Sequence, residues 1–307
     1  MAQTPKEPFE STKEQFEAAK EQFEATSAKL EARTGRNVFV AIATALIFGA
    51  IFIASLFFFK HIFVLLVAGL VSVTVLELAL AFRANGRRIP RVGGILFGLV
   101  IIAGVYFFGA IGMLAALLIS VVGLTLWRLI EGLIPGQEVA PRTLWRDVLS
   151  GVFTLVYVAF FSGFTVLLVL QENGQWWVFS LIAIVASVDV GAFASGVLFG
   201  KHKMVPKISP NKTWEGLAGA AVLSAIVAIV LTVTVLGKPW FVGLIFGLLL
   251  LITATVGDLT ESLIKRNLGI KDMSSWIPGH GGFLDRLDSV FPSTVVAYAV
   301  YLASSAL

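Results

Sequence analysis

The sequence predicts an all-α protein, a polytopic integral membrane bundle of about nine transmembrane helices with a cytoplasmic N-terminus. Of its 307 residues, 57% are hydrophobic and only 14% are charged, and the mean hydropathy is +0.90. A soluble domain carries about 25% charged residues, so this composition excludes a disordered protein, a secreted scaffold and an ordinary water-soluble enzyme. The chain has no Cys, which excludes disulfide frameworks, thiolate metal sites and a Cys nucleophile.

The apolar residues gather in stretches of membrane-spanning length, which is about 20 residues for a helix. Nine stretches qualify, although the third and fourth are short and separated by little more than Gly109. These two could instead form one long kinked or re-entrant element. The eighth is also short, and we expect its helix to continue past Asp258. The nine are Val38–Phe59, Ile62–Phe82, Val92–Phe108, Ala110–Leu126, Val148–Leu170, Trp176–Phe199, Leu217–Leu236, Phe241–Val256 and Val290–Leu307.

The basic residues between the nine stretches are sorted by side. Fifteen Lys and Arg fall on one side, and only Lys60 and Lys238 fall on the other. Loops rich in Lys and Arg stay in the cytoplasm, so this side and the N-terminus are predicted to be cytoplasmic. The net charge of +4 and the pI of 9.4 are then explained by the basic loops on the cytoplasmic side. We therefore expect no nucleic-acid partner. The fifteen are Arg83, Arg87, Arg88, Arg91, Arg128, Arg142, Arg146, Lys201, Lys203, Lys207, Lys212, Lys265, Arg266, Lys271 and Arg286.

Residues 1–36 form a polar tail before the first stretch. Phe9, Phe16, Phe23 and Leu30 recur in it every seven residues among Lys and Glu. That period predicts a cytoplasmic helix with one apolar line, lying on the membrane surface or forming a weak oligomerisation coil. The many Glu residues argue against a targeting peptide, and we expect no chemistry in this tail.

Two carboxylates lie inside predicted spans, where an ionisable group costs free energy and is by default a functional candidate. Glu77 is near the basic end of its span, so it could simply reach water or pair with Arg83. Asp189 is in mid-span, with no basic residue in its own helix, so it needs a partner such as a metal ion or a Lys. The small residues Ala192, Gly196 and Gly200 follow it at helical spacing and allow another helix to pack closely.

Two polar segments carry the remaining chemistry. The loop Gly200–Gly216 is basic and has no carboxylate before Glu215, so its donors suit a phosphate-rich ligand; they include Lys207, Ser209, Asn211, Lys212 and Thr213. The second segment is Gly257–Ser289. If its helix continues, Asp258, Ser262 and Lys265 share one face, with Glu261 beside them.

The same segment ends in a Gly-rich turn that leads into the last span. The turn reads PGHGG, with three Gly around His280, and Asp285 and Asp288 follow it at a spacing of three. Asp285 and Asp288 could merely cap a helix. Carboxylates are also the oxygen ligands that Mg²⁺ prefers, and a Gly-rich turn before a helix is a natural phosphate site. Together with Lys and Arg, these groups favour a displacement at phosphorus.

The run SLIKRNLGIKDMSSWIPGHGGFLDRLD, residues 262–288, resembles the diagnostic motif of the phosphatidate cytidylyltransferases (CDP-diacylglycerol synthases). The motif consists of a Ser and a Lys-Arg pair, then Lys-Asp, then Pro-x-His-Gly-Gly and finally Asp-Arg-x-Asp. The stretch from Asp189 through SPNKTWEG is similar to the same family, although Phe193 stands where relatives often carry Tyr. The resemblance is strong over residues 187–289, about a third of the chain.

The resemblance implies a Mg²⁺-dependent nucleotidyltransferase, with any second cation left open. Its substrates would be CTP and phosphatidate and its products CDP-diacylglycerol and pyrophosphate. It further implies a multi-pass enzyme of the cell (inner) membrane, a likeness to known homodimers and an active site that faces the cytoplasm. The chain would divide into the tail at 1–36, N-terminal transmembrane helices at 37–186 and a catalytic region at 187–307.

The residue roles implied by the resemblance fall into three groups. The expected catalytic residues are Asp258, Asp285, Lys265 and Arg286. The expected metal ligands are Asp258 and Asp285, supported by Asp189 and Asp288. The expected substrate-binding residues are Ser209, Asn211, Lys212, Thr213, Ser262, Arg266, Lys271, His280, Gly281 and Gly282.

Two other functions remain open at this point. A secondary transporter would also place a carboxylate such as Asp189 near the midplane among small residues, but it would not need the His-Gly-Gly and Asp-Arg-x-Asp elements. Another Mg²⁺-dependent lipid phosphotransferase would show its own Asp clusters, D-x-x-D-G or D-D-x-x-D, and neither pattern occurs in the chain.

Overall fold

A computed structural model describes residues 38–134, 141–277 and 281–305. Most of these residues are helical, and the only strands among them form one two-stranded antiparallel hairpin. The all-α prediction is therefore confirmed, while the predictions for the tail at 1–36 concern residues outside the described part. The elements are α2 (Val38–Phe58), α3 (Lys60–Ala84), α4 (Arg91–Gly132), α5 (Pro141–Thr154), the π-helix η1 (Leu155–Phe160), α6 (Phe161–Leu170), α7 (Gly174–Phe199), β1 (Lys203–Val205), β2 (Ser209–Thr213), α8 (Trp214–Thr234), α9 (Trp240–Leu268), α10 (Leu284–Leu287) and α11 (Val290–Ser304).

Seven helical stretches of the described chain are long and apolar enough to cross a membrane. One of them, α4, reverses direction at Gly109, which has φ +62°, a conformation that Gly adopts without a steric penalty. Across this reversal the Ser120 hydroxyl donates to the Phe97 carbonyl at 3.0 Å, so the two halves of α4 pack antiparallel. If the two halves of α4 are counted separately and the shorter apolar helix in α2 is added, the number of spans agrees with the prediction of about nine.

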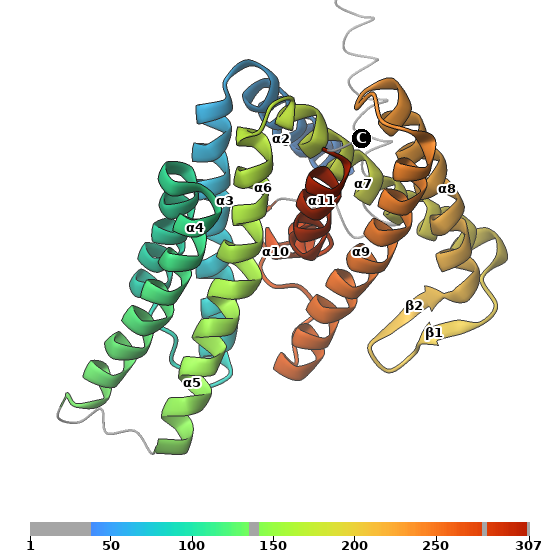
Figure 1. Cartoon of the computed structure of the whole chain (residues 1–307). Helices are drawn as coiled ribbons and strands as arrows, with labels where there is room; N and C mark the ends of the chain where they lie inside the picture. The colour runs from blue at the N-terminus through green and yellow to red at the C-terminus, as the bar shows by residue number, and fades with distance from the viewer. Residues whose placement is uncertain (1–37, 135–140, 278–280, 306–307) are drawn as a thin grey trace, which may run out of the picture.

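The helices assemble with their basic ends together (Figure 1). At the lower end of that view α3 ends, α4 begins and ends, α5 begins and α9 ends. Arg83, Arg91, Arg128, Arg146 and Arg266 belong to these helix ends. We call this the basic end of the bundle, and it is the side that the charge distribution of the sequence predicts to be cytoplasmic.

Small residues let α7 and α8 pack closely, as their spacing predicts. Gly191 of α7 lies against Ala220 of α8, and Gly196 lies against Gly216. Such pairs allow two helix backbones to approach without intervening side chains. The close contact places the β1–β2 hairpin, which joins the two helices, beside α9 (Figure 1).

A buried ion pair joins α4 to α5 near the basic end. Arg128 and Asp147 are each 1% exposed. The Arg128 guanidinium donates from Nη2 and Nε to the same Asp147 oxygen, at 2.8 and 3.2 Å. Burial of a lone charge is costly, so each partner depends on the other for its stability in this position.

We predict that Asp147→Asn lowers the free energy of unfolding by about 3 kcal/mol, the low end of the range for breaking a buried ion pair, because the buried Arg128 charge keeps only its longer contact to Glu131 Oε2 at 3.7 Å. The double variant Arg128→Leu/Asp147→Leu should recover part of this loss. Thermal unfolding of the detergent-solubilised protein measures both effects. A single variant as stable as the wild type would contradict the role given to the pair.

Candidate active site between α9 and α10

After α9 the chain turns back into the bundle instead of continuing away from it. Gly269 ends α9 in a left-handed conformation, with φ +67°, and the short helix α10 then lies between α3 and α6 on one side and α9 on the other (Figure 1). Within this segment the backbone N–H of Ile277 donates to the Gly281 carbonyl at 2.9 Å. A non-helical segment that lies among the helices of a membrane bundle is stable only if its backbone polar groups find hydrogen-bond partners.

Glu77 of α3 supplies those partners. Its Oε2 accepts from the backbone N–H of Leu284 at 2.7 Å, and its Oε1 accepts from the N–H of Phe283 at 3.2 Å and from the Ser274 hydroxyl. The side chain is 1% exposed. The interpretation that Glu77 reaches water or pairs with Arg83 is therefore wrong, and Arg83 donates instead to the Ile89 carbonyl at 3.2 Å.

The Glu77 contact also explains a Gly in the motif. A Cβ on Gly282 would overlap the Glu77 carboxylate and come within 3.0 Å of the Asp285 side chain. The backbone N–H of Gly282 meanwhile donates to Asp285 Oδ2 at 2.8 Å. Gly282 is thus required for close approach between α3 and α10, and it serves the structure of the site in addition to any role in binding.

Asp285 is held from three directions. Its Oδ1 accepts from Lys265 Nζ at 2.9 Å, and its Oδ2 accepts from the backbone N–H groups of Met273 and Gly282 at 3.1 and 2.8 Å. Lys265 also pairs with Glu261 at 2.5 Å. Lys265 therefore bridges a carboxylate of α9 and one of α10, and only its pairing with Glu261 on the same helix follows from the helical face predicted for this segment.

Two further carboxylates, Asp258 and Asp288, lie together with Glu261 beside this bridge. Ligand oxygens of Asp258, Glu261 and Asp288 lie within 4.8 Å of one another, and Glu261 and Asp288 are buried. The Tyr157 hydroxyl lies 3.4 Å from the Gly257 carbonyl and 3.3 Å from the Asp288 carbonyl. Tyr157 thus ties the backbone next to Asp258 to the backbone of Asp288.

This group of carboxylates fits a divalent cation. Glu261 Oε1 is buried and has no hydrogen-bond partner among the described residues, and an orphaned buried carboxylate oxygen is costly unless a positive charge meets it. Oxygen ligands from several carboxylates are the set that Mg²⁺ prefers. We call Asp258, Glu261, Asp285 and Asp288 the acidic group.

A cleft of about 290 Å³, lined by both polar and apolar side chains, opens beside the acidic group, between α7, the hairpin, α8 and α9. Lys212 of β2 forms an ion pair with Asp258 at the base of the cleft, and Ser262 donates to Asp258 Oδ1 at 3.3 Å. The cleft therefore leads directly to the acidic group. The predicted residues that line it are Asp189, Ser209, Asn211, Lys212, Thr213 and Asp258.

Asp189 belongs to this cleft and does not form a separate site within the membrane. Lys212 lines the same cleft as Asp189, and the positive charges that act on Asp189 are those of Lys212 on β2 and Arg286 on α10. This location removes the basis for a transporter that uses Asp189 alone.

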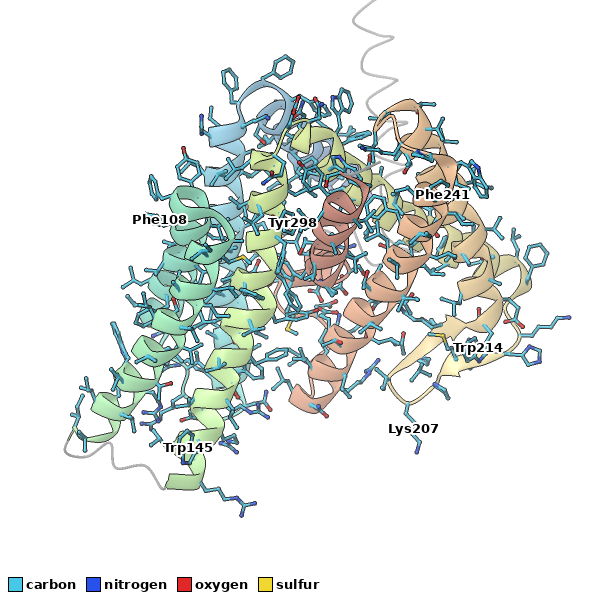
Figure 2. All side chains as sticks on the ribbon, viewed as in Figure 1. Phe108, Trp145, Lys207, Trp214, Phe241 and Tyr298 are labelled. Carbon is cyan, nitrogen blue, oxygen red and sulfur yellow. The ribbon has the colours of Figure 1, made fainter. Side chains whose placement is uncertain are left out.

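The other predicted residues take varied positions. Arg266 donates from Nε to the Ile208 carbonyl at 3.2 Å and so holds the hairpin against α9. The Thr213 hydroxyl accepts from the Gly216 N–H at 3.1 Å and caps α8. Lys271 and Arg286 are exposed, whereas His280 lies outside the described residues. In the lower right of Figure 2, Lys207 projects away from the hairpin, and it does not line the cleft.

Two residues of the site, Glu77 and Glu261, were not among the predicted site residues. Glu77 lies about 200 residues before its partners, so no local pattern links them. A local signal did exist for Glu261, because it is three residues after Asp258 and four before Lys265, which places it on the same helix face.

Comparison with known proteins identifies the family. A model of the cytidylyltransferase family matches residues 39–304. The chain belongs to the cytidylyltransferase family. The phosphatidate cytidylyltransferase of Mycobacterium bovis is 40% identical over 274 residues, which cover 88% of this chain and 90% of that protein. The enzyme of the same name from Mycobacterium leprae is 39% identical, over 87% and 88% of the two chains.

A more distant relative matches a shorter part of the chain. The Bacillus subtilis phosphatidate cytidylyltransferase is 40% identical over 121 residues, 39% of this chain and 45% of that protein. The resemblance drawn from the motif is thus confirmed over most of the chain. This cytidylyltransferase is a nucleotidyltransferase built as a helical membrane bundle.

We predict that Glu77→Gln loosens α10, because an amide offers only one acceptor oxygen where the carboxylate meets three donors. Hydrogen bonds to a charged group contribute about 1.5–3 kcal/mol each, so amide hydrogen exchange in residues 281–288 should accelerate at least about tenfold. Glu172→Gln, at an exposed position between α6 and α7, is the control. Unchanged exchange in Glu77→Gln would show that the contact does not hold the segment.

We also predict that Glu261→Gln weakens Mn²⁺ binding about 10- to 100-fold, the range seen when a group supporting a metal is removed. The free Mn²⁺ signal in electron paramagnetic resonance measures the affinity without any need for turnover. Glu131→Gln, on α4, should leave the affinity unchanged. Equal affinities for all three proteins would exclude Glu261 from the metal site.

Proposed function

We propose that this protein transfers CMP from CTP to phosphatidate and releases CDP-diacylglycerol and pyrophosphate. The observation that carries the proposal is the ion pair between Lys212 and Asp258, which joins a phosphate-suited cleft to the acidic group. The family membership supports the same reaction, because relatives that align over most of the chain are phosphatidate cytidylyltransferases by name.

We further propose that the acidic group holds Mg²⁺. Asp258 and Asp285 are the ligands implied by the motif, and Glu261 and Asp288 are close enough to share the ion. Asp189, across the cleft, would support the site electrostatically. When bound, Mg²⁺ would gather the phosphates and offset the charge that develops on the leaving pyrophosphate.

The residues of the chain itself would position the two substrates. Ser209, Asn211 and Lys212 line the cleft and offer hydroxyl, amide and ammonium donors to the nucleotide phosphates. Lys265 lies between the carboxylates of α9 and α10, where its charge would stabilise an incoming phosphate. Arg286, Arg266 and Lys271 lie nearer the surface and remain proposed phosphate contacts.

The bond changes require no strong general base. An oxygen of the phosphatidate phosphate would attack the α-phosphorus of CTP in line, and the bond from that phosphorus to the β-phosphate oxygen would break. A phosphate monoester has its second pKa at about 6, so the nucleophile is already ionised near neutral pH. Catalysis would then rest on positioning and charge, with His280 as a turn or positioning residue.

Orientation and assembly are also proposals. The cleft is lined by residues near the end of α7, in the basic hairpin and at the start of α8, which supports an active site that faces the cytoplasm from the cell (inner) membrane. CTP would be available on that side. Association into a homodimer rests on the family resemblance alone.

We predict that the purified protein with Mg²⁺, phosphatidate and CTP labelled in its α-phosphate moves label into the organic phase. Asp258→Asn and Asp285→Asn should each lower kcat at least about 100-fold, equivalent to about 2.7 kcal/mol of transition-state stabilisation. Transfer no greater than that of a boiled sample would refute the reaction. Near-normal rates in both variants would refute the metal assignment while leaving the reaction intact.

A further inference from the structure

A second groove lies at the basic end, between α3, α5 and α9. It has a volume of about 330 Å³ and shares no lining residue with the cleft. Its wall on α9 includes Ile264 and Asn267, whereas Asp258 of the same helix faces the cleft. The groove is therefore separate from the site described above. The lining side chains on α3, on α5 and in the turn after α3 are Phe82, Arg87, Arg146, Leu149, Ser150 and Phe153.

Both arginines of the groove are held in place by their own contacts. Arg87 donates from Nη1 to the Ser150 hydroxyl at 2.8 Å, and its guanidinium lies 5.1 Å from the centre of the Phe82 ring. Arg146 donates from Nη2 to the Gly86 carbonyl at 3.1 Å. Each of these bonds uses one of the five N–H donors of a guanidinium, so each arginine keeps further donors for a ligand.

The groove carries an uncompensated positive charge among its described residues. None of its lining residues is acidic. The neighbouring carboxylate on α5, Asp147, is buried against Arg128 and does not reach the groove. Ser150, which accepts from Arg87, is 4% exposed and donates to the Arg146 carbonyl at 2.8 Å. Two fixed cations without a counter-charge suit an anionic ligand, and paired guanidinium groups suit a phosphate.

Exposed apolar side chains border the groove. Leu149 is 65% exposed, and Trp145, one turn earlier on α5, is 62% exposed. Figure 2 shows Trp145 at the end of the bundle where α5 begins, the level at which Trp commonly meets a membrane interface. A ligand that reaches the groove from this side therefore needs an apolar part next to its phosphate.

We propose that this groove binds an anionic phospholipid, with its phosphate on Arg87 and Arg146 and its acyl chains along Leu149 and Phe153. The site is distinct from the place of reaction, and the proposal does not depend on the cytidylyl transfer. Because Asn85 also donates to the Leu268 carbonyl at 3.0 Å, a lipid in the groove would join α3, α5 and α9 where these helices already meet. The bound lipid should therefore stabilise the basic end.

The test uses the full chain in detergent and native mass spectrometry, with dioleoylphosphatidylglycerol as the probe. The variant Arg87→Gln/Arg146→Gln removes both charges, and Arg88→Gln/Arg142→Gln removes two exposed arginines nearby that do not line the groove. We expect the dissociation constant to rise at least about tenfold in the first variant and to change little in the second. Equal weakening in both variants would mean a diffuse surface charge and would overturn the proposal.

A third variant and two comparison ligands complete the test. Leu149→Asp changes only an exposed rim residue and leaves both arginines in place, so it should weaken phosphatidylglycerol binding even if the double variant is unstable. Inorganic phosphate and the zwitterionic dioleoylphosphatidylcholine are compared at the same concentrations. Displacement of phosphatidylglycerol by millimolar phosphate, or equal retention of phosphatidylcholine, would contradict a site for an anionic lipid.

Discussion

The carboxylate of Glu77 is the contact on which the active-site geometry depends. The chain after α9 re-enters the bundle without regular structure, and the N–H groups at the start of α10 would be unsatisfied there. One side chain from α3 accepts from two of these N–H groups and from the Ser274 hydroxyl. Because these bonds fix the start of α10, they also fix the direction in which Asp285 and Asp288 face α9.

The acidic group is stable only because cations are placed among its members. Lys265 meets Glu261 and Asp285, and Lys212 meets Asp258. Each lysine reduces the cost of burying like charges together. Four ionised carboxylates would carry more charge than two lysines offset, and Glu261 Oε1 is buried with no hydrogen-bond partner among the described residues. The remaining negative charge is the physical reason to expect a divalent cation and, through it, polyphosphate binding.

Much of this arrangement could be predicted from local sequence. Hydropathy predicted two short stretches or one kinked element around Gly109, and the small residues after Asp189 predicted that another helix packs closely on α7. Helical spacing placed Asp258, Ser262 and Lys265 on one face. These features depend on residues within a few turns of one another, so their physics is visible in a short window.

The contacts between distant segments could not be predicted in this way. Nothing near Glu77 indicates that its partners are Phe283 and Leu284, so its position near a helix end favoured a solvent contact. Helical spacing likewise could not show that Lys265 would take Asp285 as well as Glu261. The groove at Arg87 and Arg146 forms only when α3, α5 and α9 are assembled, and in the sequence its arginines are indistinguishable from other cytoplasmic basic residues.

The central claim is that α10 brings its carboxylates to those of α9 to form one metal site. A crystal or cryo-electron microscopy structure with Mn²⁺ and CTP tests this most directly, and in crystals the anomalous signal of Mn²⁺ locates the ion. We expect an ion held by Asp258 together with Asp285 or Asp288, and CTP phosphates that extend into the cleft beside Lys212. An ion bound away from these residues, with Lys265 still joining Glu261 to Asp285, would contradict it.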